Sequence, residues 1–435
     1  MANPDGKNSY SNGNQPDDNE LREELLKLST EMLSQDQARA RLKAKFNYSI
    51  GRSKYFTLMS KFNIPTPRRN AKTMPPELMK SLVLEKLDED VSRRNGPNTI
   101  QNKLARDGVP LPRDMIRLTQ KEAQGPAAAI QRMPGYGKPK IPRGKLLIIG
   151  PFQEIHTDGH EKYARQALRM GDCTIGIYGM RDHVGFIHLM KTVPDAREGA
   201  AVGHLHLDMI VGTGYRAAVQ MTYDLGHKTK EMKRQQFTIR EHCSGLDPDE
   251  FPVVWETKST HNISIESAWK WFRQYNGIGI RDIIEQGKSN GIFIQSNPVH
   301  TNLFHWLFPK LVQSCLDDFI AYWNTHKIRK QNSPLSGITP THAMECPEQY
   351  GMVSGAIDVP PDLIEELRSR LPDRNEVFRW VSDDFEIMAG AAYDMIGRPS
   401  LVGPAAMKKG WEIFHQMAAV IDSFHQQEDE DKGLK

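Results

Sequence analysis

The chain of 435 residues is poor in cysteine and lacks the short motifs of several large enzyme classes. Its four cysteines (Cys173, Cys243, Cys315 and Cys346) lie far apart without CxxC spacing, which predicts reduced, buried thiols rather than a disulfide framework. There is no P-loop, no GxGxxG at a strand–helix junction, no GxSxG and no HExxH. These absences argue against nucleotide hydrolases of the P-loop type, dinucleotide-binding dehydrogenases, α/β-hydrolases and zincin proteases.

Long apolar runs are also missing. No run approaches the length of a membrane span, and the N-terminal residues do not resemble a secretory signal, so we expect an intracellular protein without a membrane partner. Residues 1–20 are mostly Asn, Gly, Asp, Ser and Gln, a composition that predicts disorder. The remaining length allows two to four domains.

Charge is unevenly distributed along the chain. Residues 21–145 contain 26 Lys and Arg against 12 Asp and Glu, whereas residues 146–435 contain 30 against 38. A basic front half joined to an acidic rear half predicts that the front half meets a polyanion such as DNA. The alternative is that these basic side chains only keep helix surfaces solvated.

Two segments of the front half have the pattern of helix-turn-helix units. Residues 21–66 begin with leucines at helical spacing, and a second helix capped by Ser34 is followed by a turn and a basic helix from Arg52. Arg52, Lys54 and Thr57 are the candidates for facing a DNA groove. The alternative for each unit is a plain helical hairpin. Pro65, Pro67, Arg68 and Arg69 look like a linker.

The second unit covers residues 75–124, with helices predicted over 76–92, over 99–106 and from about 112. Arg113, Arg117 and Lys121 are spaced at i, i+4 and i+8, so they share one helix face and are candidate DNA contacts. Residues 125–150 are rich in Gly, Pro and basic groups, which predicts a linker able to lie along DNA phosphates.

Residues 151–345 alternate between strand and helix patterns, which predicts an α/β domain. The strands are expected at about 152–159, 173–181, 184–192, 217–223 and 252–257. The helices are expected at about 195–212, 228–242, 262–276 and 299–327. Residues 356–425 predict a helical C-terminal region, with helices at 361–371 and 404–424.

Three acidic residues stand in settings that suit metal chemistry. Asp158 precedes a glycine in a strand pattern, Asp224 ends an apolar strand pattern, and Glu266 lies at a predicted helix start. Two carboxylates on strand ends and a third on a helix can hold a pair of Mg²⁺ or Mn²⁺ ions for phosphodiester chemistry. Each also has a plain structural interpretation, as a strand-end turn aspartate or as a glutamate favoured by the helix dipole.

The ordered set of motifs from about Glu154 to Gly351 resembles the catalytic core of DDE-type integrases and transposases. This group includes the retroviral integrases and fungal proteins with an integrase core domain. The matching segments are Asp158-Gly159, Arg181 to Phe186, Asp224-x-Gly226, His261-Asn262 with Glu266, and Pro334 to Pro340. The resemblance implies an RNase H-like fold with a mixed five-stranded sheet, with Asp158, Asp224 and Glu266 as catalytic ligands of two metal ions. It also implies cleavage and transfer of DNA strands, a nuclear location and a homo-oligomer.

The surroundings of these acids add candidates and one departure from the family pattern. Lys270 and Arg273 lie four and seven residues after Glu266, on the same helix face, and suit DNA phosphates. Lys228 follows Asp224 where the family has acidic or amide groups, so it is either a phosphate contact or the sign of a domesticated, inactive copy that still binds DNA. A plain RNase H-like nuclease remains a further alternative.

Nine histidines lie between His156 and His261 in the predicted core, but none has zinc-site spacing. His204-x-His206 and the neighbours His242 and Cys243 lack a paired second motif, and the first 150 residues contain neither His nor Cys. A structural zinc site is therefore not expected. His160 and His261, which flank two of the acids, are candidates for supporting or DNA contacts.

Overall fold

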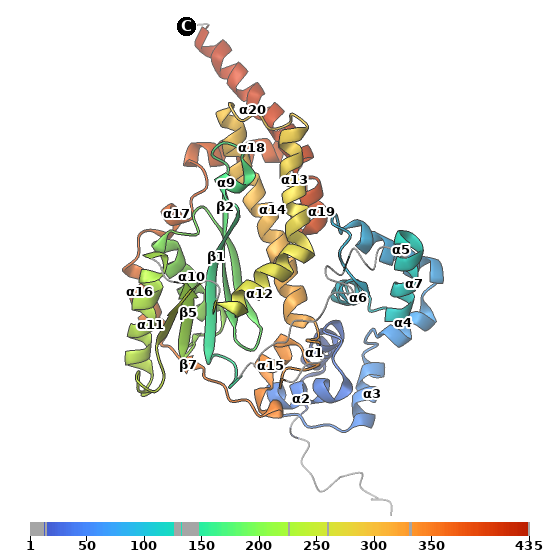
Figure 1. The fold of residues 1–435 in the computed structure, drawn as a ribbon. Helices are drawn as coiled ribbons and strands as arrows, with labels where there is room; N and C mark the ends of the chain where they lie inside the picture. The colour runs from blue at the N-terminus through green and yellow to red at the C-terminus, as the bar shows by residue number, and fades with distance from the viewer. Residues whose placement is uncertain are drawn as a thin grey trace, which may run out of the picture. The chain divides into compact units, whose positions relative to one another are not determined.

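The structure is a computed structural model that divides into two compact units (Figure 1). One unit contains Met1–Gly150 and Tyr322–Val353, and the other contains Pro151–Ala321 and Ser354–Lys435. The residues that it describes are 13, 15–125, 132, 148–224, 227–258, 261–329 and 333–433. The predicted basic linker 125–150 lies almost entirely outside the described residues. None of the described helices is long and apolar enough to cross a membrane.

The first unit begins with three helices around an apolar core. They are α1 (Asp18–Thr30), α2 (Gln35–Phe46) and α3 (Arg52–Lys61). Ser34 caps α2 through a reciprocal pair of hydrogen bonds with Gln37, as its sequence pattern predicts. The helix α1 begins inside the stretch 1–20 for which disorder was predicted. This correction has a local cause, because the Asp17 side chain accepts a hydrogen bond from the backbone N–H of Asn19.

Four further helices follow in the first unit. They are α4 (Pro67–Thr73), α5 (Pro76–Asp88), α6 (Pro97–Arg106) and α7 (Arg113–Gln124). The helix α4 replaces the linker predicted around Pro67, because proline is favoured at a first helical position and Thr66 caps the helix. The turn between α6 and α7 contains Gly108 at a φ of +80°. Val83, Ile100 and Ile116 are fully buried in the core of these helices.

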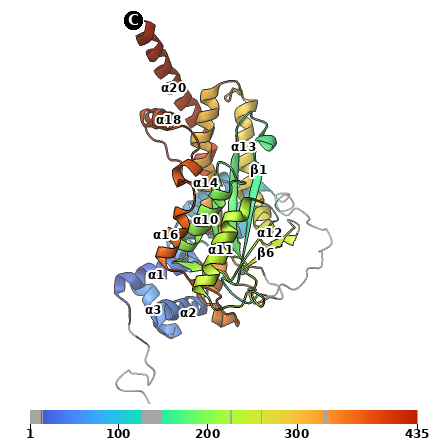
Figure 2. The same ribbon diagram turned by 90° about the vertical axis from the view of Figure 1, so that its left-hand side faces the viewer.

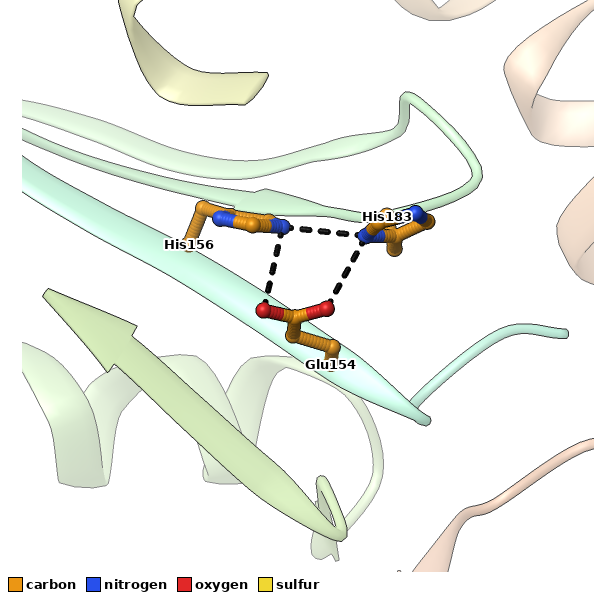
Figure 3. Close-up of side chains that lie close together, drawn as sticks. All are labelled: Glu154, His156 and His183. Atoms are coloured by element: carbon orange, nitrogen blue, oxygen red, sulfur yellow. Dashed lines mark hydrogen bonds and ion pairs between the residues drawn. The ribbon is translucent and has the colours of Figure 1, made fainter. Parts of the chain in front are cut away.

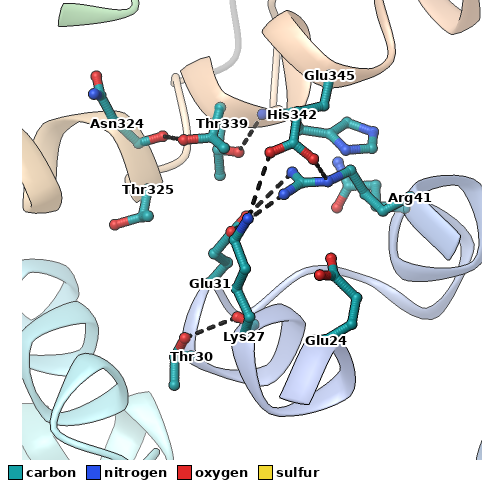
Figure 4. A network of polar contacts seen from close by, with 12 residues as sticks. Glu24, Lys27, Thr30, Glu31, Arg41, Asn324, Thr325, Thr339, His342 and Glu345 are labelled. Carbon is teal, nitrogen blue, oxygen red and sulfur yellow. Dashed lines mark hydrogen bonds and ion pairs between the residues drawn. The ribbon is translucent and has the colours of Figure 1, made fainter. Parts of the chain in front are cut away.

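Residues Tyr322–Val353 belong to the first unit, which differs from the predicted core boundary at 345. Buried Arg41 on α2 pairs with Glu31 at 3.3 Å and also with Glu345, the last residue of α15 (Pro340–Glu345) (Figure 4). Lys27 pairs with Glu345 at 3.7 Å. The two ion pairs with Glu345 join segments about 300 positions apart in the chain, and local sequence patterns do not predict such contacts.

A five-stranded mixed sheet forms the centre of the second unit, and the prediction of an α/β fold is confirmed. Its strands are β1 (Glu154–Tyr163), β2 (Ile175–Asp182), β3 (Ile187–Val193), β5 (Gln220–Asp224) and β6 (Val254–Thr257). The strand order is β3-β2-β1-β5-β6. The first three strands are antiparallel, whereas β5 and β6 run parallel to β1.

Helices cover both faces of this sheet (Figures 1 and 2). One face meets α10 (Gly199–Gly212) and α11 (Lys230–Cys243), and the other meets α12 (Ile263–Phe272) and α14 (Pro298–Thr325). The helix α12 continues through a π-helical turn, Arg273–Gly277, into α13 (Ile278–Ser289), whereas the sequence predicted a single α-helix over 262–276. The hydroxyl of Tyr163 donates to the carbonyl of Gly277 in this turn.

The C-terminal region packs within the second unit. Its elements are β7 (Ile357–Asp358), α16 (Pro361–Ser369), α17 (Arg374–Val377), α18 (Asp383–Met395), α19 (Gly403–Lys408) and α20 (Gly410–Gly433). The short strand β7 pairs with β4 (Arg216–Ala217). Arg368 and Arg374 both bind Asp208 of α10. Trp411 donates to the carbonyl of Ile283 on α13 at 2.6 Å. The predicted C-terminal helical region is therefore part of the second unit.

Candidate functional site

Asp158 lies on the central strand β1, on the face covered by α12. Its Oδ2 accepts a hydrogen bond of 3.1 Å from the indole N–H of Trp269 on α12. The Trp269 ring stacks on His160 with ring centroids 4.7 Å apart. A Cβ atom at Gly179, the β2 residue opposite Asp158, would lie 2.7 Å from the Trp269 ring. The absence of a side chain at Gly179 therefore lets the indole reach the carboxylate.

Asp224 ends the neighbouring parallel strand β5. Thr157 pairs with Tyr223 across these strands, so Asp158 and Asp224 occupy adjacent strand positions. Asp224 Oδ1 is buried and has no hydrogen-bond partner among the described residues. Burial raises the pKa of Asp158, the nearby Lys228 opposes this effect, and the negative charge of Asp224 adds to it. A carboxylate pair with an unpartnered oxygen is a feature that a bound cation would satisfy.

Lys228 lies in the short 3₁₀ segment η1 (His227–Thr229), between β5 and α11. Its Nζ is 3.3 Å from Asp158 Oδ1, and 21% of its side chain is exposed. The residue that was predicted as a possible phosphate contact therefore points to the first acid. Both oxygens of Asp158 have protein donors, one from Lys228 and one from Trp269.

Glu266 is exposed on α12, one helical turn before Trp269. Among the described residues, one group of three metal-ligating side chains has its ligand atoms within 4.8 Å of one another. Neither Glu266 nor the two aspartates belong to this group. The structure thus places Asp158 beside Asp224 but does not gather all three predicted acids into one ligand cluster. Lys270 and Arg273 are both exposed on the Glu266 side of the sheet.

The compact cluster consists of Glu154, His156 and His183 (Figure 3). His156 Nε2 lies 3.0 Å from His183 Nδ1 and 3.5 Å from Glu154 Oε1. His183 Nδ1 lies 3.1 Å from Glu154 Oε2. Two imidazole nitrogens and a carboxylate therefore converge on one point, and such a set can hold a metal ion.

Neighbouring groups hold each member of this cluster in place. His156 Nδ1 is 3.0 Å from Asn262 Oδ1, and Asn262 Nδ2 donates to the carbonyl of Thr157 at 3.0 Å. The hydroxyl of Thr222 on β5 donates to Glu154 Oε1 at 2.5 Å. The backbone N–H of His183 donates to the carbonyl of Glu154 at 2.9 Å.

The turn that carries His183 is fixed by buried Asp182. This carboxylate accepts hydrogen bonds from the backbone N–H groups of Phe152 and Val184. Gly185, at a φ of +96°, closes the turn by donating to the Asp182 carbonyl. The ring of His183 is thus presented to β1 from a tight, well-bonded turn.

Charge and burial oppose one another in this cluster. Burial would raise the pKa of Glu154, but hydrogen bonds from His183 and Thr222 and the charge of His156 hold it at about 2. Burial lowers the pKa of His156, and nearby Glu154 opposes this shift. A carboxylate beside an imidazole whose protonation is opposed by burial, as at His156, is the form that binds a metal cation.

Sequence reasoning missed this cluster because its members are not a spaced motif. Glu154 and His156 are two residues apart on a strand and therefore share a face. His183 lies beyond the end of the next strand, and only the register that pairs Ile155 with Asp182 brings it alongside. The histidines that were considered for zinc have other partners, because His204 contacts the carbonyl of Pro372 and His206 contacts Gln235.

The predicted DNA contacts of the first unit are exposed. Arg52, Lys54 and Thr57 lie on the surface of α3, whose opposite face buries Tyr55 and Leu58 in the core. Arg113, Arg117 and Lys121 are likewise exposed along α7. Arg113 donates to the Asn98 side chain at the start of α6.

No protein-family model, curated protein or solved structure matches this chain. The evidence for its fold and candidate sites therefore comes from its own sequence and structure. Within the second unit these give two adjoining polar sites on one face of β1. One contains Asp158 and Asp224, and the other contains Glu154, His156 and His183.

Proposed function

We propose that the second unit is an RNase H-like core of the DDE integrase type, which cleaves and transfers DNA strands with Mg²⁺ or Mn²⁺. The observation that carries the proposal is the pairing of Asp158 and Asp224 on adjacent parallel strands, with Asp224 Oδ1 buried and without a hydrogen-bond partner in the part of the chain that the structure describes. The strand order β3-β2-β1-β5-β6, with three antiparallel strands followed by two parallel ones, supports it. So does the resemblance of the ordered motifs.

The residues present fit a divalent cation in part. Asp158 and Asp224 would hold it, and Glu266 would join them from α12. Bound metal would supply activation of water or a 3′ hydroxyl and stabilisation of the leaving oxygen. The chain's own groups hold the carboxylate of Asp158 through Trp269 and offer Lys270 and Arg273 to DNA phosphates.

The second candidate is a DNA-binding protein that keeps this fold without strand transfer. It is favoured by Lys228, whose ammonium pairs with Asp158 Oδ1 and provides a positive charge where the carboxylate pair would otherwise attract a metal ion. In this case Lys228 stabilises the pair of acids permanently, and the basic helices of the first unit provide the activity that remains.

The deciding experiment measures nicking and strand joining on labelled plasmid DNA with Mn²⁺. Wild type is compared with Asp158→Asn, Asp224→Asn and Glu266→Gln, and DNA binding is measured for each protein. We expect activity in wild type and its loss in all three variants, with binding retained. The exposed pair of Asp394, on α18, and Arg398, in the segment after it, supplies a control, because Arg398→Ala should leave activity unchanged.

Other outcomes separate the candidates. Wild type that binds DNA well but neither nicks nor joins it, on substrates that include candidate DNA ends, supports the DNA-binding protein. Cleavage without joining, with a preference for RNA–DNA hybrids, supports a nuclease. DNA as partner, the nucleus as location and a homo-oligomer are parts of the same proposal, and sedimentation of the protein with and without DNA tests the last of these.

A further inference from the structure

The geometry points to a transition-metal site at Glu154, His156 and His183, separate from the Asp158–Asp224 pair and independent of the function proposed above. The ion is of the Zn²⁺ class, bound by two imidazole nitrogens and one carboxylate with a coordination position left open for water. The cluster lies on one face of β1, at the end of the strand where β5 and the turn after β2 meet it (Figure 3).

The separations of the ligand atoms suit a zinc ion. Ligand atoms bound to tetrahedral zinc at 2.0–2.1 Å lie about 3.4 Å apart. His156 Nε2 and His183 Nδ1 lie 3.0 Å apart, and they lie 3.5 Å from Oε1 and 3.1 Å from Oε2 of Glu154, respectively. These separations are close to the zinc value, so a zinc ion can be bound between the two nitrogens and the carboxylate with small side-chain shifts.

The hydrogen bonds around His156 fix the orientation of its ring. Asn262 Nδ2 donates to the carbonyl of Thr157, which leaves Asn262 Oδ1 facing His156 Nδ1. The hydrogen of the neutral imidazole is therefore on Nδ1, and Nε2 directs a lone pair into the cluster. An acceptor behind the ring that fixes the tautomer in this way is a regular companion of metal-binding histidines.

The cluster contains fewer hydrogen-bond donors than its acceptor atoms need. With His156 Nε2 acting as an acceptor, the lone pairs of His156 and Glu154 face one hydrogen at most, on His183 Nδ1. The hydroxyl of Thr222 supplies a further donor to Glu154 Oε1 only. A divalent ion satisfies all three ligands at once, whereas hydrogen bonds within the cluster cannot.

The donor set also separates this site from the acid pair. Imidazole with carboxylate favours Zn²⁺ and its neighbours among the transition metals, whereas Mg²⁺ prefers oxygen ligands alone. Asp158 lies two residues beyond His156, roughly 7 Å along the strand. An ion held by Glu154, His156 and His183 would therefore brace the start of β1 beside the acids without using their oxygens.

The test measures metal in the purified full-length protein. The protein is stripped with a chelator, titrated with Co²⁺ and Zn²⁺, and analysed for metal content by mass spectrometry and for the visible absorption of low-symmetry Co²⁺. We expect one equivalent of ion in wild type, a rise in melting temperature with Zn²⁺, and loss of both in His183→Ala and Glu154→Gln. Asn262→Ala should weaken binding by about 10–100-fold.

Two controls keep the result specific. His242→Ala removes an exposed histidine on α11 and should retain the ion, as should Asp158→Asn, which disables the acid pair. Wild type without stoichiometric Co²⁺ or Zn²⁺ overturns the proposal, and so does equal affinity in folded His183→Ala. Circular dichroism checks the fold of each variant. If His183→Ala does not fold, Glu154→Gln, which keeps the Thr222 hydrogen bond possible, decides.

Discussion

Lys228 Nζ lies 3.3 Å from Asp158 Oδ1, so an ammonium group supplies the positive charge beside the Asp158–Asp224 pair. The Asp158 side chain is 10% exposed, and its second oxygen accepts from Trp269. This contact offsets the repulsion between the two acids. It also places a residue of the chain in competition with any metal ion that the acids attract.

Replacing Lys228 with Met should make the acid pair depend on metal. Without the ammonium, Asp158 keeps a buried charge beside Asp224, so we expect a loss of about 1–3 kcal/mol in unfolding free energy in the presence of EDTA. Added Mn²⁺ should raise the melting temperature of Lys228→Met more than that of wild type. Differential scanning calorimetry measures both. An equal rise in melting temperature with Mn²⁺ in the two proteins would show that Lys228 does not compete with metal ions for the acid pair.

Replacing Gly179 with Ala should displace Trp269. The added methyl would lie 2.7 Å from the indole ring, and overpacking of this kind costs about 1–3 kcal/mol. Urea unfolding and tryptophan fluorescence measure the change. Gly212→Ala is the matched control, since its Cβ meets nothing within 4 Å. Equal stability of the two variants would contradict the close packing described for Trp269.

Stability should fall with acid because of buried His206. Burial lowers the pKa of His206 from 6.5 to about 4, and its hydrogen bond to Gln235 opposes the shift. Between these values the unfolded chain binds a proton that the native chain does not, so stability is lost as the pH falls through this window. From about pH 7 to about pH 5 the loss is roughly 2 kcal/mol.

The change to test is His206→Gln, which removes the titrating group. Urea unfolding across this pH range should show a smaller acid-induced loss in His206→Gln than in wild type. His242→Gln, at an exposed position, should keep the wild-type pH dependence. The quantity compared is the slope of unfolding free energy against pH, so a change in stability that is equal at every pH does not alter the comparison. An unchanged slope in His206→Gln would contradict it.

Replacing Arg41 should destabilise the first unit strongly. Its buried guanidinium pairs with Glu31 and Glu345, and burial already raises the pKa of Glu31. Arg41→Met leaves buried Glu31 without this ion pair and Glu345 with Lys27 alone, at a cost of about 3–5 kcal/mol. The double variant with Glu31→Leu should lose less than the sum of the single changes. Hydrogen exchange of α2 and α15 measures the effect, and additive losses would contradict it.

Replacing Arg113 and Arg117 with Ala should weaken DNA binding in a salt-dependent way. Both side chains are exposed on α7. Removing two phosphate contacts lowers the slope of log affinity against log salt by about 2, because each contact releases about 0.9 counterion. Fluorescence anisotropy over a salt series measures the slope. The control Arg398→Ala should leave it unchanged, and an unaltered slope in the double variant would rule out α7 as a DNA contact.

Much of the secondary structure follows from local patterns. The strand patterns of residues 151–345 predict all five strands of the sheet, and Ser34 marks the start of α2. The errors also have local causes. Pro67 suggested a linker but begins α4 at a favoured first position, and the predicted helix 262–276 changes to a π-helical turn at Arg273.

The sequence by itself determined the five strands of the sheet, many of the helices, the α/β class and the strand positions of Asp158 and Asp224, because strand period and capping are local properties. Only the tertiary structure decided what those residues touch. The pairing of Lys228 with Asp158 and the meeting of His183 with Glu154 depend on strand register and on turns between strands. The ion pair between Glu345 and Arg41 forms because two segments far apart in the sequence pack together. Such contacts are fixed by packing, which no short stretch of sequence encodes.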